Sequence, residues 1–343
     1  MCDAKPVSVI IPTYNEEDTI IGCIKSLLAG DYPVDKLEFI FADGGSSDNT
    51  LKRIEDFVRK NPDVTIKVVN NPHRTQGYGL NIAIEKIDTQ SEIIIRADAH
   101  SIYPHNYIMD CVKTILTVDA ENVGGVMVPI GRTHFQKAVA FCMSNPLGVG
   151  DAKFRLGVTS GFVDTVYLSC FKKDVLERVG LFDPKMTPNE DAEFNLRILK
   201  SGGKIYLNSK IKVQYFPRDT ITGLGKQYFR YGQGRCRTFK KHKRFTSVRQ
   251  VIPPTWVVFS LITGFMSSIS NLFLIPLLVY LSVLLIVSVY GIMRNHCSAI
   301  MLSPLCLIIM HYAWGIGFLL ELLKRGSKNG VWPSCRAIGT ELP

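Results

Sequence analysis

The chain has 343 residues, a formal net charge of +10 and a hydrophobic fraction of 46%, with a mean hydropathy of +0.13. This composition is too apolar for an ordinary soluble protein and indicates that part of the chain lies in a membrane. The nine cysteines include no C-x-x-C pair and no metal-like spacing, which argues against a zinc ribbon or a disulfide framework and favours a reducing compartment.

The first 130 residues alternate strand patterns with helix patterns. Apolar, β-branched runs predict strands at Val7–Ile11, Leu37–Ala42, Thr65–Val69, Glu92–Ala97 and Val123–Pro129. Helical periodicity runs from about Glu16 to Gly30, then over Leu51–Lys60 and Leu80–Ile87. Because strands and helices alternate, we expect right-handed crossovers and a mostly parallel sheet of the α/β class.

The pattern is less regular after residue 130. We predict a strand at Gly161–Ser169, a short helix at Lys173–Val179 and a longer helix at Asp191–Lys200. The N-terminal residues lead directly into the first strand, without the basic and apolar regions of a leader, so we expect no signal peptide.

A basic segment and three apolar stretches complete the chain. Nine Lys or Arg and no acidic residue lie between Lys226 and Arg249, whereas Arg294 is the only charged residue from 251 to 320. The apolar stretches are Trp256–Ile269, Leu272–Met293 and Ser298–Leu323, of which only the second and third are long enough to cross ~30 Å of hydrocarbon. The chain therefore divides into a globular domain (1–225), a basic juxtamembrane segment (226–250), transmembrane helices (251–325) and a tail (326–343).

The basic segment indicates which side of the membrane the globular domain occupies. By the positive-inside tendency it predicts a cytosolic contact with anionic headgroups, worth about 1 kcal/mol per charge near the surface. A solvated linker is the alternative. Two spans, with the first apolar stretch lying in or dipping into the membrane, would keep Lys324 and Arg325 on the same side. Nucleic acid is not an expected partner, because the basic residues do not form a face of a folded module.

Polar side chains follow each of the first four predicted strands. These groups are Thr13–Glu16, Asp43–Asp48, Arg74–Gly77 and Asp98–His100. Ligands of parallel α/β sheets bind beyond the carboxyl ends of the strands, so we expect these side chains to share one rim.

Two of these groups suggest specific chemistry. Asp43 could accept a hydrogen bond from a nucleobase imide, with Gly44 and Gly45 allowing close approach, but a turn before a capped helix has the same pattern. Asp98 and His100 could hold one divalent ion that also binds a diphosphate. From spacing alone, a lone aspartate turn with a surface histidine is the simpler reading.

Three further groups each allow two interpretations. Asn189-Glu190-Asp191 could place a general base at a helix start, or merely acids that complement the helix dipole. Arg74–Gly77 could close over phosphates or form a solvated loop. Gln227–Gly232 mixes aromatic and basic groups, which is also typical of an interfacial anchor. Neither G-x-G-x-x-G nor a phosphate-binding G-x-x-x-x-G-K-[ST] is complete anywhere in the chain.

Taken in order, these segments resemble the family 2 glycosyltransferases of the A-type nucleotide-sugar fold. The resemblance rests on Pro12–Glu16, Asp43–Thr50, Asp98–His100 and Glu190-Asp191. It is nearer to the succinoglycan-type glucosyltransferases of exopolysaccharide assembly, through segments at 96–100, 148–155, 163–166, 180–183 and 227–232. It covers about residues 6–250, with a similar membrane tail after it.

The resemblance implies an A-type glycosyltransferase domain with a mostly parallel sheet, followed by a C-terminal helical membrane region. It implies an inverting enzyme that moves one sugar from a nucleotide-sugar, UDP-linked, to a lipid-linked saccharide in polysaccharide or glycoconjugate assembly. Asp191 would be the base, and Asp98 and His100 would hold Mg²⁺ or Mn²⁺. The implied donor-binding residues are Pro12, Thr13, Tyr14, Glu16, Asp43, Arg74, Gly77 and Asp98. The implied residues on the acceptor or diphosphate side are Glu190, Gln227 and Arg230.

Two departures from the family pattern affect these expectations. His100 stands in the last place of the usual Asp-x-Asp, which bears on metal choice. Tyr231 replaces the Trp of the Gln-x-x-Arg-Trp pattern of processive synthases, so we expect one sugar to be added per acceptor.

Two other functions remain open. One is a synthase that charges polyprenyl phosphate itself. The other is a non-catalytic membrane-bound subunit that binds nucleotide-sugar, against which the joint presence of Asp43, Asp98 and Asp191 argues. The expected partners are donor, acceptor and membrane lipids, and no protein partner is implied. We expect the protein in the cell membrane, multi-pass or anchored, with its catalytic domain in the cytosol.

Overall fold

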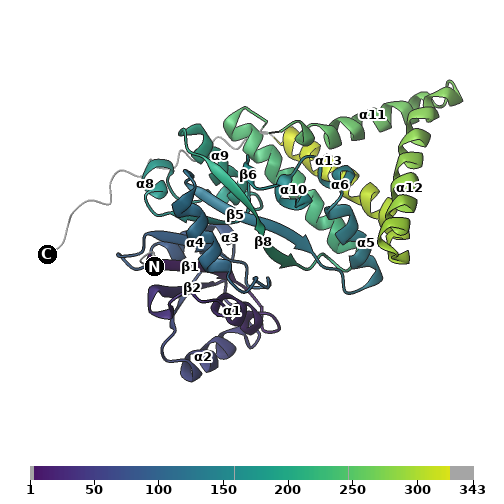
Figure 1. Ribbon diagram of the computed structural model, residues 1–343. Coiled ribbons are helices and arrows are strands. Elements are labelled where there is room, and N and C mark those ends of the chain that lie inside the picture. Colours follow the sequence, from purple (N-terminus) through teal and green to yellow (C-terminus); the bar gives the residue numbers. More distant parts are fainter. Residues whose placement is uncertain (1–3, 158, 246, 325–343) are drawn as a thin grey trace.

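The computed structural model describes residues 4–157, 159–245 and 247–324, and the following sections concern those residues. They form a mixed sheet of eight strands in the order β3-β2-β1-β4-β7-β5-β8-β6 (Figure 1). The strands are β1 (Val7–Thr13), β2 (Leu37–Asp43), β3 (Thr65–Asn70), β4 (Ile93–Arg96), β5 (Asn122–Pro129), β6 (Gly161–Phe162), β7 (Tyr167–Lys172) and β8 (Ile205–Tyr215). Strands β1 to β4 pair in parallel, as do β5 and β8, so the expected mostly parallel sheet is confirmed.

Successive residues of a strand point to opposite faces of the sheet, and most residues of β1 and β2 are apolar. Both faces of the sheet are therefore apolar, and helices cover each of them. Val9 and Ile11 of β1 face α1, α2 and α4, whereas Ile10 faces α3 and α9. The helices of the globular part are α1 (Ile20–Leu28), α2 (Thr50–Lys60), α3 (Gln76–Ile84), α4 (Tyr107–Thr117), α5 (His134–Met143), α6 (Pro146–Val149), α7 (Lys153–Leu156), α8 (Val175–Val179) and α9 (Glu190–Lys200). Short 3-10 helices lie at Val34–Lys36, Pro184–Met186, Val248–Gln250, Asn271–Leu274 and Ser298–Leu302.

One predicted strand is wrong in its extent. Gly161–Ser169 is not continuous: its first two residues form β6, which pairs with β8 at the sheet edge. The chain then crosses over, and β7 enters between β4 and β5, antiparallel to both. The sequence pattern could not predict this break, because periodicity shows which residues form a strand but not which neighbouring strand they pair with.

Four helices form the C-terminal part of the described chain. They are α10 (Ile221–His242), α11 (Ile252–Met266), α12 (Ile275–Asn295) and α13 (Ser303–Leu323). Two segments, Asn271–Asn295 and Ser298–Leu323, are long and apolar enough to cross a membrane, and α11 is shorter. Helices α11 and α12 project from the globular part, whereas α13 returns alongside α10 (Figure 1).

Glycines allow α10 and α13 to approach closely. A Cβ on Gly317 would lie 2.2 Å from the carbonyl oxygen of Phe229, and one on Gly232 would lie 2.0 Å from that of Trp314. Any larger residue at either position would hold the two helices apart. Helix α13 therefore packs against α10, backbone to backbone.

The basic segment is a packed helix over residues 226–242 rather than a solvated linker, and the boundary expected at residues 225/226 falls inside α10. Several of its cations contact acids elsewhere in the described chain. Arg237 pairs with Glu321 at 3.1 Å, and Arg249 with Asp164 at 2.8 Å. Only part of the basic charge is therefore available to lipid headgroups. The tail at 326–343 lies outside the described residues.

Candidate active site

A cavity of about 530 Å³ lies at the carboxyl end of the sheet and extends to the apolar helices. Three groups of residues line it. The sheet side contributes Gln76, Arg96, Asp98 and His100; the start of α9 contributes Glu190 and Asp191; and α10, α11 and α13 contribute Gln227, Tyr228, Tyr231, Arg235, Trp256, Met310 and Trp314. Of the strand-end side chains predicted to share a rim, Gln76, Asp98 and His100 meet the C-terminal helices in this cavity, whereas the loops Thr13–Glu16 and Asp43–Asp48 do not line it.

Arg96 is the central cation of this site. It ends β4, is buried, and lies 3.2 Å from Glu190 Oε1, 3.6 Å from Asp98 Oδ1 and 3.8 Å from Asp191 Oδ2. Burial lowers the pKa of Arg96, but Glu190, Asp98 and Asp191 raise it more. The guanidinium therefore holds three carboxylates together, which would otherwise repel each other in a buried space.

The two adjacent acids of α9 have different environments. The Glu190 side chain is 3% exposed, and burial raises its pKa to about 7, with Arg96 opposing and Asp191 adding to the shift. The Asp191 side chain is 36% exposed. Successive helical residues point about 100° apart, so the two acids cannot face the same way. Asp191 is the more accessible of the two, and Glu190 mainly anchors Arg96.

Asp98 and His100 are arranged in a way that suits a divalent ion. Gln76 Nε2 donates to Asp98 Oδ1 at 3.2 Å, and His100 Nδ1 lies 3.0 Å from Glu16 Oε1. A carboxylate on one ring nitrogen is the usual partner of a metal-bound histidine and leaves the other nitrogen for the ion. Glu16 raises the pKa of His100 by this bond, with burial opposing. Within the described residues no group of three His, Cys, Asp or Glu could enclose an ion, so further ligands would come from substrate phosphates.

The loops after β1 and β2 are tied to each other. Both Gly45 N and Ser46 N donate to Asp43 Oδ2, at 2.9 and 3.0 Å, and Asn15 N donates to Ser46 Oγ at 2.9 Å. Asp43 is buried at the base of this turn, whereas Tyr14 is 49% exposed above it.

The remaining predicted donor residues border the same loops. Pro12 and Thr13 end β1, and Thr13 Oγ1 donates back to Ile11 O at 3.1 Å. The guanidinium of Arg74 lies over Gly45, since a Cβ there would meet it at 3.5 Å. Gly77 packs within the first turn of α3, where a Cβ would lie 3.0 Å from Pro184.

The predicted residues of α10 occupy different positions. Gln227 lines the cavity, where its Nε2 lies 2.7 Å from the Tyr215 hydroxyl and 3.0 Å from that of Tyr231. Arg230 is exposed and is not among the residues that line the cavity. Arg235, which the sequence reading did not single out, lines it together with Arg155 of α7. Helical spacing from Gln227 could have indicated Arg235, because positions four and eight residues later share its face.

Comparison with known proteins identifies the family. Residues 8–180 match glycosyl transferase family 2. The chain is also 31% identical over 316 residues to the succinoglycan biosynthesis protein ExoA of Rhizobium meliloti, covering 92% of this chain and 94% of that protein. The chain belongs to glycosyl transferase family 2. The resemblance drawn from the sequence motifs is thereby confirmed, and the protein is a glycosyltransferase.

Two further relatives extend along most of this glycosyltransferase. The dolichyl N-acetyl-α-D-glucosaminyl phosphate 3-β-D-2,3-diacetamido-2,3-dideoxy-β-D-glucuronosyltransferase of Methanococcus voltae is 26% identical over 329 residues, which is 94% of this chain and 98% of that protein. The mannosyltransferase PcManGT of Pyrobaculum calidifontis, solved with GDP-Man and Mn²⁺, has a TM-score of 0.65 at 19% identity, covering 93% of this chain and 88% of that one. The latter likeness supports the A-type fold.

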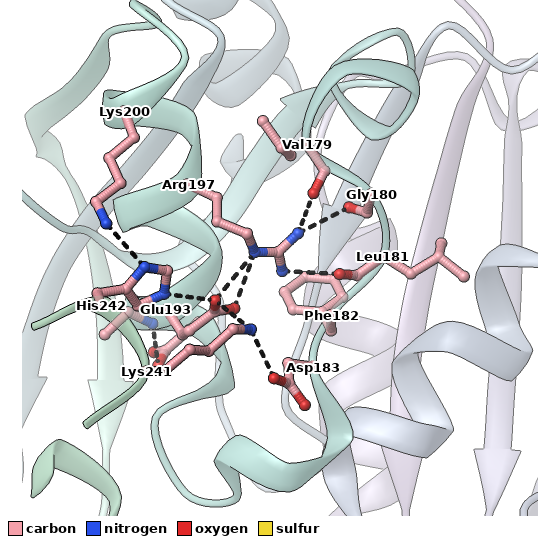
Figure 2. A network of polar contacts seen from close by, with 12 residues as sticks. Val179, Gly180, Leu181, Phe182, Asp183, Glu193, Arg197, Lys200, Lys241 and His242 are labelled. Atoms are coloured by element: carbon pink, nitrogen blue, oxygen red, sulfur yellow. Dashed lines mark hydrogen bonds and ion pairs between the residues drawn. The ribbon is translucent and has the colours of Figure 1, made fainter. Parts of the chain in front are cut away.

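The helix that carries Asp191 in this glycosyltransferase is held by a second charged cluster, centred on Glu193 (Figure 2). Glu193 is fully buried and accepts from Arg197 at 3.0 Å, from Lys241 at 2.8 Å and from His242 at 2.9 Å. Lys200 Nζ lies 2.9 Å from the other ring nitrogen of His242, which adds Lys200 to the same cluster. Burial raises the pKa of Glu193, but its cationic partners lower it more.

The same cluster joins α9 to two other parts of the fold. Arg197 donates to the carbonyls that follow α8, including Leu181 O at 2.7 Å, and Lys241 reaches Asp183 at 2.6 Å (Figure 2). Lys241 and His242 belong to the end of α10. The helix that positions Glu190 and Asp191 is therefore fixed directly to the basic helix.

Proposed function

We propose that this enzyme transfers one sugar, with inversion at the anomeric carbon, from a nucleotide-sugar to a saccharide linked to a membrane lipid. The observation that carries the proposal is the shared cavity. One wall is formed by Asp98, His100 and Asp191, and another by Trp256 and Trp314 of the apolar helices. A soluble acceptor does not require a cavity that opens toward such helices, whereas a lipid-linked acceptor does.

The carboxyl ends of β2 and β4 carry the groups that a nucleotide-sugar requires, and of these Asp98 and His100 line the cavity. Asp43, at the base of the β2 turn, would accept a hydrogen bond from the base, and we propose uracil. The carboxylate of Asp98 and the imidazole of His100 would hold Mg²⁺ or Mn²⁺, which when bound offsets the charge that develops on the departing nucleoside diphosphate. PcManGT was solved with Mn²⁺, which supports a divalent ion.

Asp191 is our proposed base. An acceptor hydroxyl is a weak nucleophile at neutral pH, and a positioned carboxylate that takes its proton raises its reactivity. In a single in-line displacement the hydroxyl oxygen bonds to the anomeric carbon as the bond to the diphosphate breaks, and Asp191 receives the proton. Arg96 keeps the carboxylates of this site in place.

Membrane attachment accompanies this function. Two apolar segments are long enough to span, and α10 presents cations beside them. We propose a membrane enzyme whose catalytic domain faces the cytosol. The dolichyl-linked substrate in the name of the Methanococcus relative supports an acceptor of the lipid-linked class.

A screen of radiolabelled nucleotide-sugars against membrane lipid extracts tests the proposal. The full-length protein should label a lipid-linked saccharide, and NMR of the product should give the inverted anomer. Labelling of bare polyprenyl phosphate would assign the enzyme to the synthases instead. Transfer to water-soluble acceptors alone would refute a lipid-linked acceptor. Failure to hydrolyse or transfer from any donor would favour a non-catalytic subunit.

A further inference from the structure

Three arginines line the cavity without a carboxylate partner among the described residues: Arg218, which is exposed, and Arg155 and Arg235, which are partly buried. Arg96 is surrounded by acids, and Arg249 pairs with Asp151 and Asp164. In contrast, neither Arg155 nor Arg235 forms an ion pair with any acid among the described residues, although both line the same cavity as Asp191. A cation removed from water without a counter-charge is costly, so such positions usually bind an anion.

The surroundings of Arg155 show that its donors are not satisfied by the fold. Its Nη1 is buried without a hydrogen-bond partner, and so is the hydroxyl of Tyr228. The guanidinium carbon lies 5.4 Å from the centre of the Phe154 ring, which buries one face of the cation without supplying an acceptor. Burial raises the pKa of Tyr228 to about 12, so its hydroxyl keeps its proton. Arg155 acts in the opposite direction on this pKa, which indicates that the guanidinium and the hydroxyl are close enough to interact.

Arg235 is in a similar position on α10. Burial lowers its pKa, and the charge of Asp191 opposes that shift only in part. Among the acids, Asp191, the proposed base, has the larger effect on this pKa, and Asp164 has a smaller one. Because Arg155, Arg235 and Asp191 line the same cavity, an anion held by the two arginines would share that cavity with the proposed base.

We infer that Arg155, Arg235 and the Tyr228 hydroxyl bind the phosphate or diphosphate that joins the acceptor saccharide to its lipid. The ligand class is a polyisoprenoid phosphate or diphosphate carrying a sugar. This inference rests on the proposed function and adds the residues that recognise the acceptor.

The position of the two arginines favours the acceptor over the donor as the source of this phosphate. The donor diphosphate is expected beside Asp98 and His100, on the sheet side of Asp191. Arg235 belongs to α10, whose residues 229–232 lie against α13. On the same side the cavity is lined by Trp256 of α11 and Trp314 of α13, which offer an apolar path for a lipid chain.

Binding to full-length protein in detergent micelles tests the inference. The probes are a polyprenyl diphosphate and the matching uncharged polyprenol, and the readout is tryptophan fluorescence, since Trp256 and Trp314 line the cavity. Arg155→Gln and Arg235→Gln should each weaken diphosphate binding about tenfold, the effect of losing one charged hydrogen bond, and leave polyprenol binding unchanged. Arg155→Lys should retain part of the binding. Arg53→Gln, an exposed arginine of α2, is the matched control.

Kinetics distinguish the two sources of the anion. We expect both glutamine variants to raise the KM for a lipid-linked acceptor, with the KM for the nucleotide-sugar and inhibition by UDP or GDP unchanged. Weaker UDP or GDP inhibition with unchanged lipid binding would assign the arginines to the donor and overturn the inference. Unchanged binding of both ligands would overturn it as well. If the wild type uses lipid-linked acceptors yet binds polyprenol as tightly as the diphosphate, only this subsite fails; if it uses none, the proposed function itself fails.

Discussion

Replacing Asp191 by asparagine tests the activation of the acceptor hydroxyl. The Asp191 side chain is 36% exposed and lines the cavity, and asparagine keeps its size but cannot accept the proton. A positioned general base contributes about 10²–10⁴-fold to the rate, or about 3–5 kcal/mol of the barrier. We expect kcat to fall by this factor. The KM for the nucleotide-sugar should stay nearly unchanged, because the predicted donor contacts lie at Asp43 and Asp98.

Glu190→Gln is the matched control for this change. Glu190 is buried 3.2 Å from Arg96, and we expect it to act on the reaction mainly through that guanidinium, with a loss of less than about tenfold in the variant. Its stability effect should depend on pH. Since folding raises the pKa of Glu190 from 4.5 to about 7, the unfolded chain loses this proton first. Wild-type stability should therefore decline between these pH values, by on the order of 3 kcal/mol, and the variant should show a shallower decline.

Steady-state kinetics and thermal unfolding between pH 4 and pH 8 provide the measurements. If Glu190→Gln abolishes transfer and Asp191→Asn does not, the base is Glu190 and our assignment is wrong. The same conclusion would follow if the wild-type turnover rate rises as the pH passes about 7 and the residual rate of Glu190→Gln does not change with pH. If both variants lose donor binding equally, these acids have a structural role.

Three further changes have defined outcomes. Glu16→Gln should weaken Mn²⁺ binding about 10- to 100-fold, because His100 loses the carboxylate that orients its ring, and calorimetry showing unchanged affinity would contradict this. Glu193→Gln should destabilise the protein by about 1–3 kcal/mol at neutral pH, since the partly exposed Arg197 and Lys241 lose the charge of a buried acceptor. Because folding lowers the pKa of Glu193, the wild-type advantage in thermal unfolding should disappear as pH falls below the usual carboxyl range; an advantage that persists in acid would refute the linkage. Gly317→Val should separate α13 from α10, at a cost of about 1–3 kcal/mol or more, and an unchanged melting temperature in detergent would count against the close contact.

The N-terminal half of the fold could be predicted because each element there has a local signal. Strand β4 contains Ile93–Ile95 followed at once by polar residues, and Gly30 follows α1. The predicted boundaries differ from the observed ones by a few residues. For example, the third helix was predicted to begin at Leu80, whereas α3 begins at Gln76. Helices α4 and α5 and strand β8 were not predicted. The order in which β7 enters the sheet depends on long-range pairing and has no local signature.

Only those residues of the candidate site that belong to a recognisable sequence motif could be predicted. Asp98, His100, Glu190 and Asp191 stand at strand and helix ends, where fold rules bring them to one rim, and they line one cavity. Arg155 belongs to the 148–155 segment of the resemblance but was given no role, because it lies on the short helix α7 rather than at the end of a predicted strand or helix. The family pattern pointed to Arg230, but the packing of α10 turns that residue away from the cavity.

The contact between α10 and α13 also constrains the order in which the protein can become active during synthesis. Met127 of the sheet and Leu224 of α10 share one apolar cluster with Met310 of α13, the last described helix to leave the ribosome. The nucleotide half of the domain can fold as it emerges. The cavity cannot be complete until α12 has been made and Trp314 of α13 has joined its lining. A nascent chain would thus gain its donor site early and acquire transfer activity only after its apolar helices are in place.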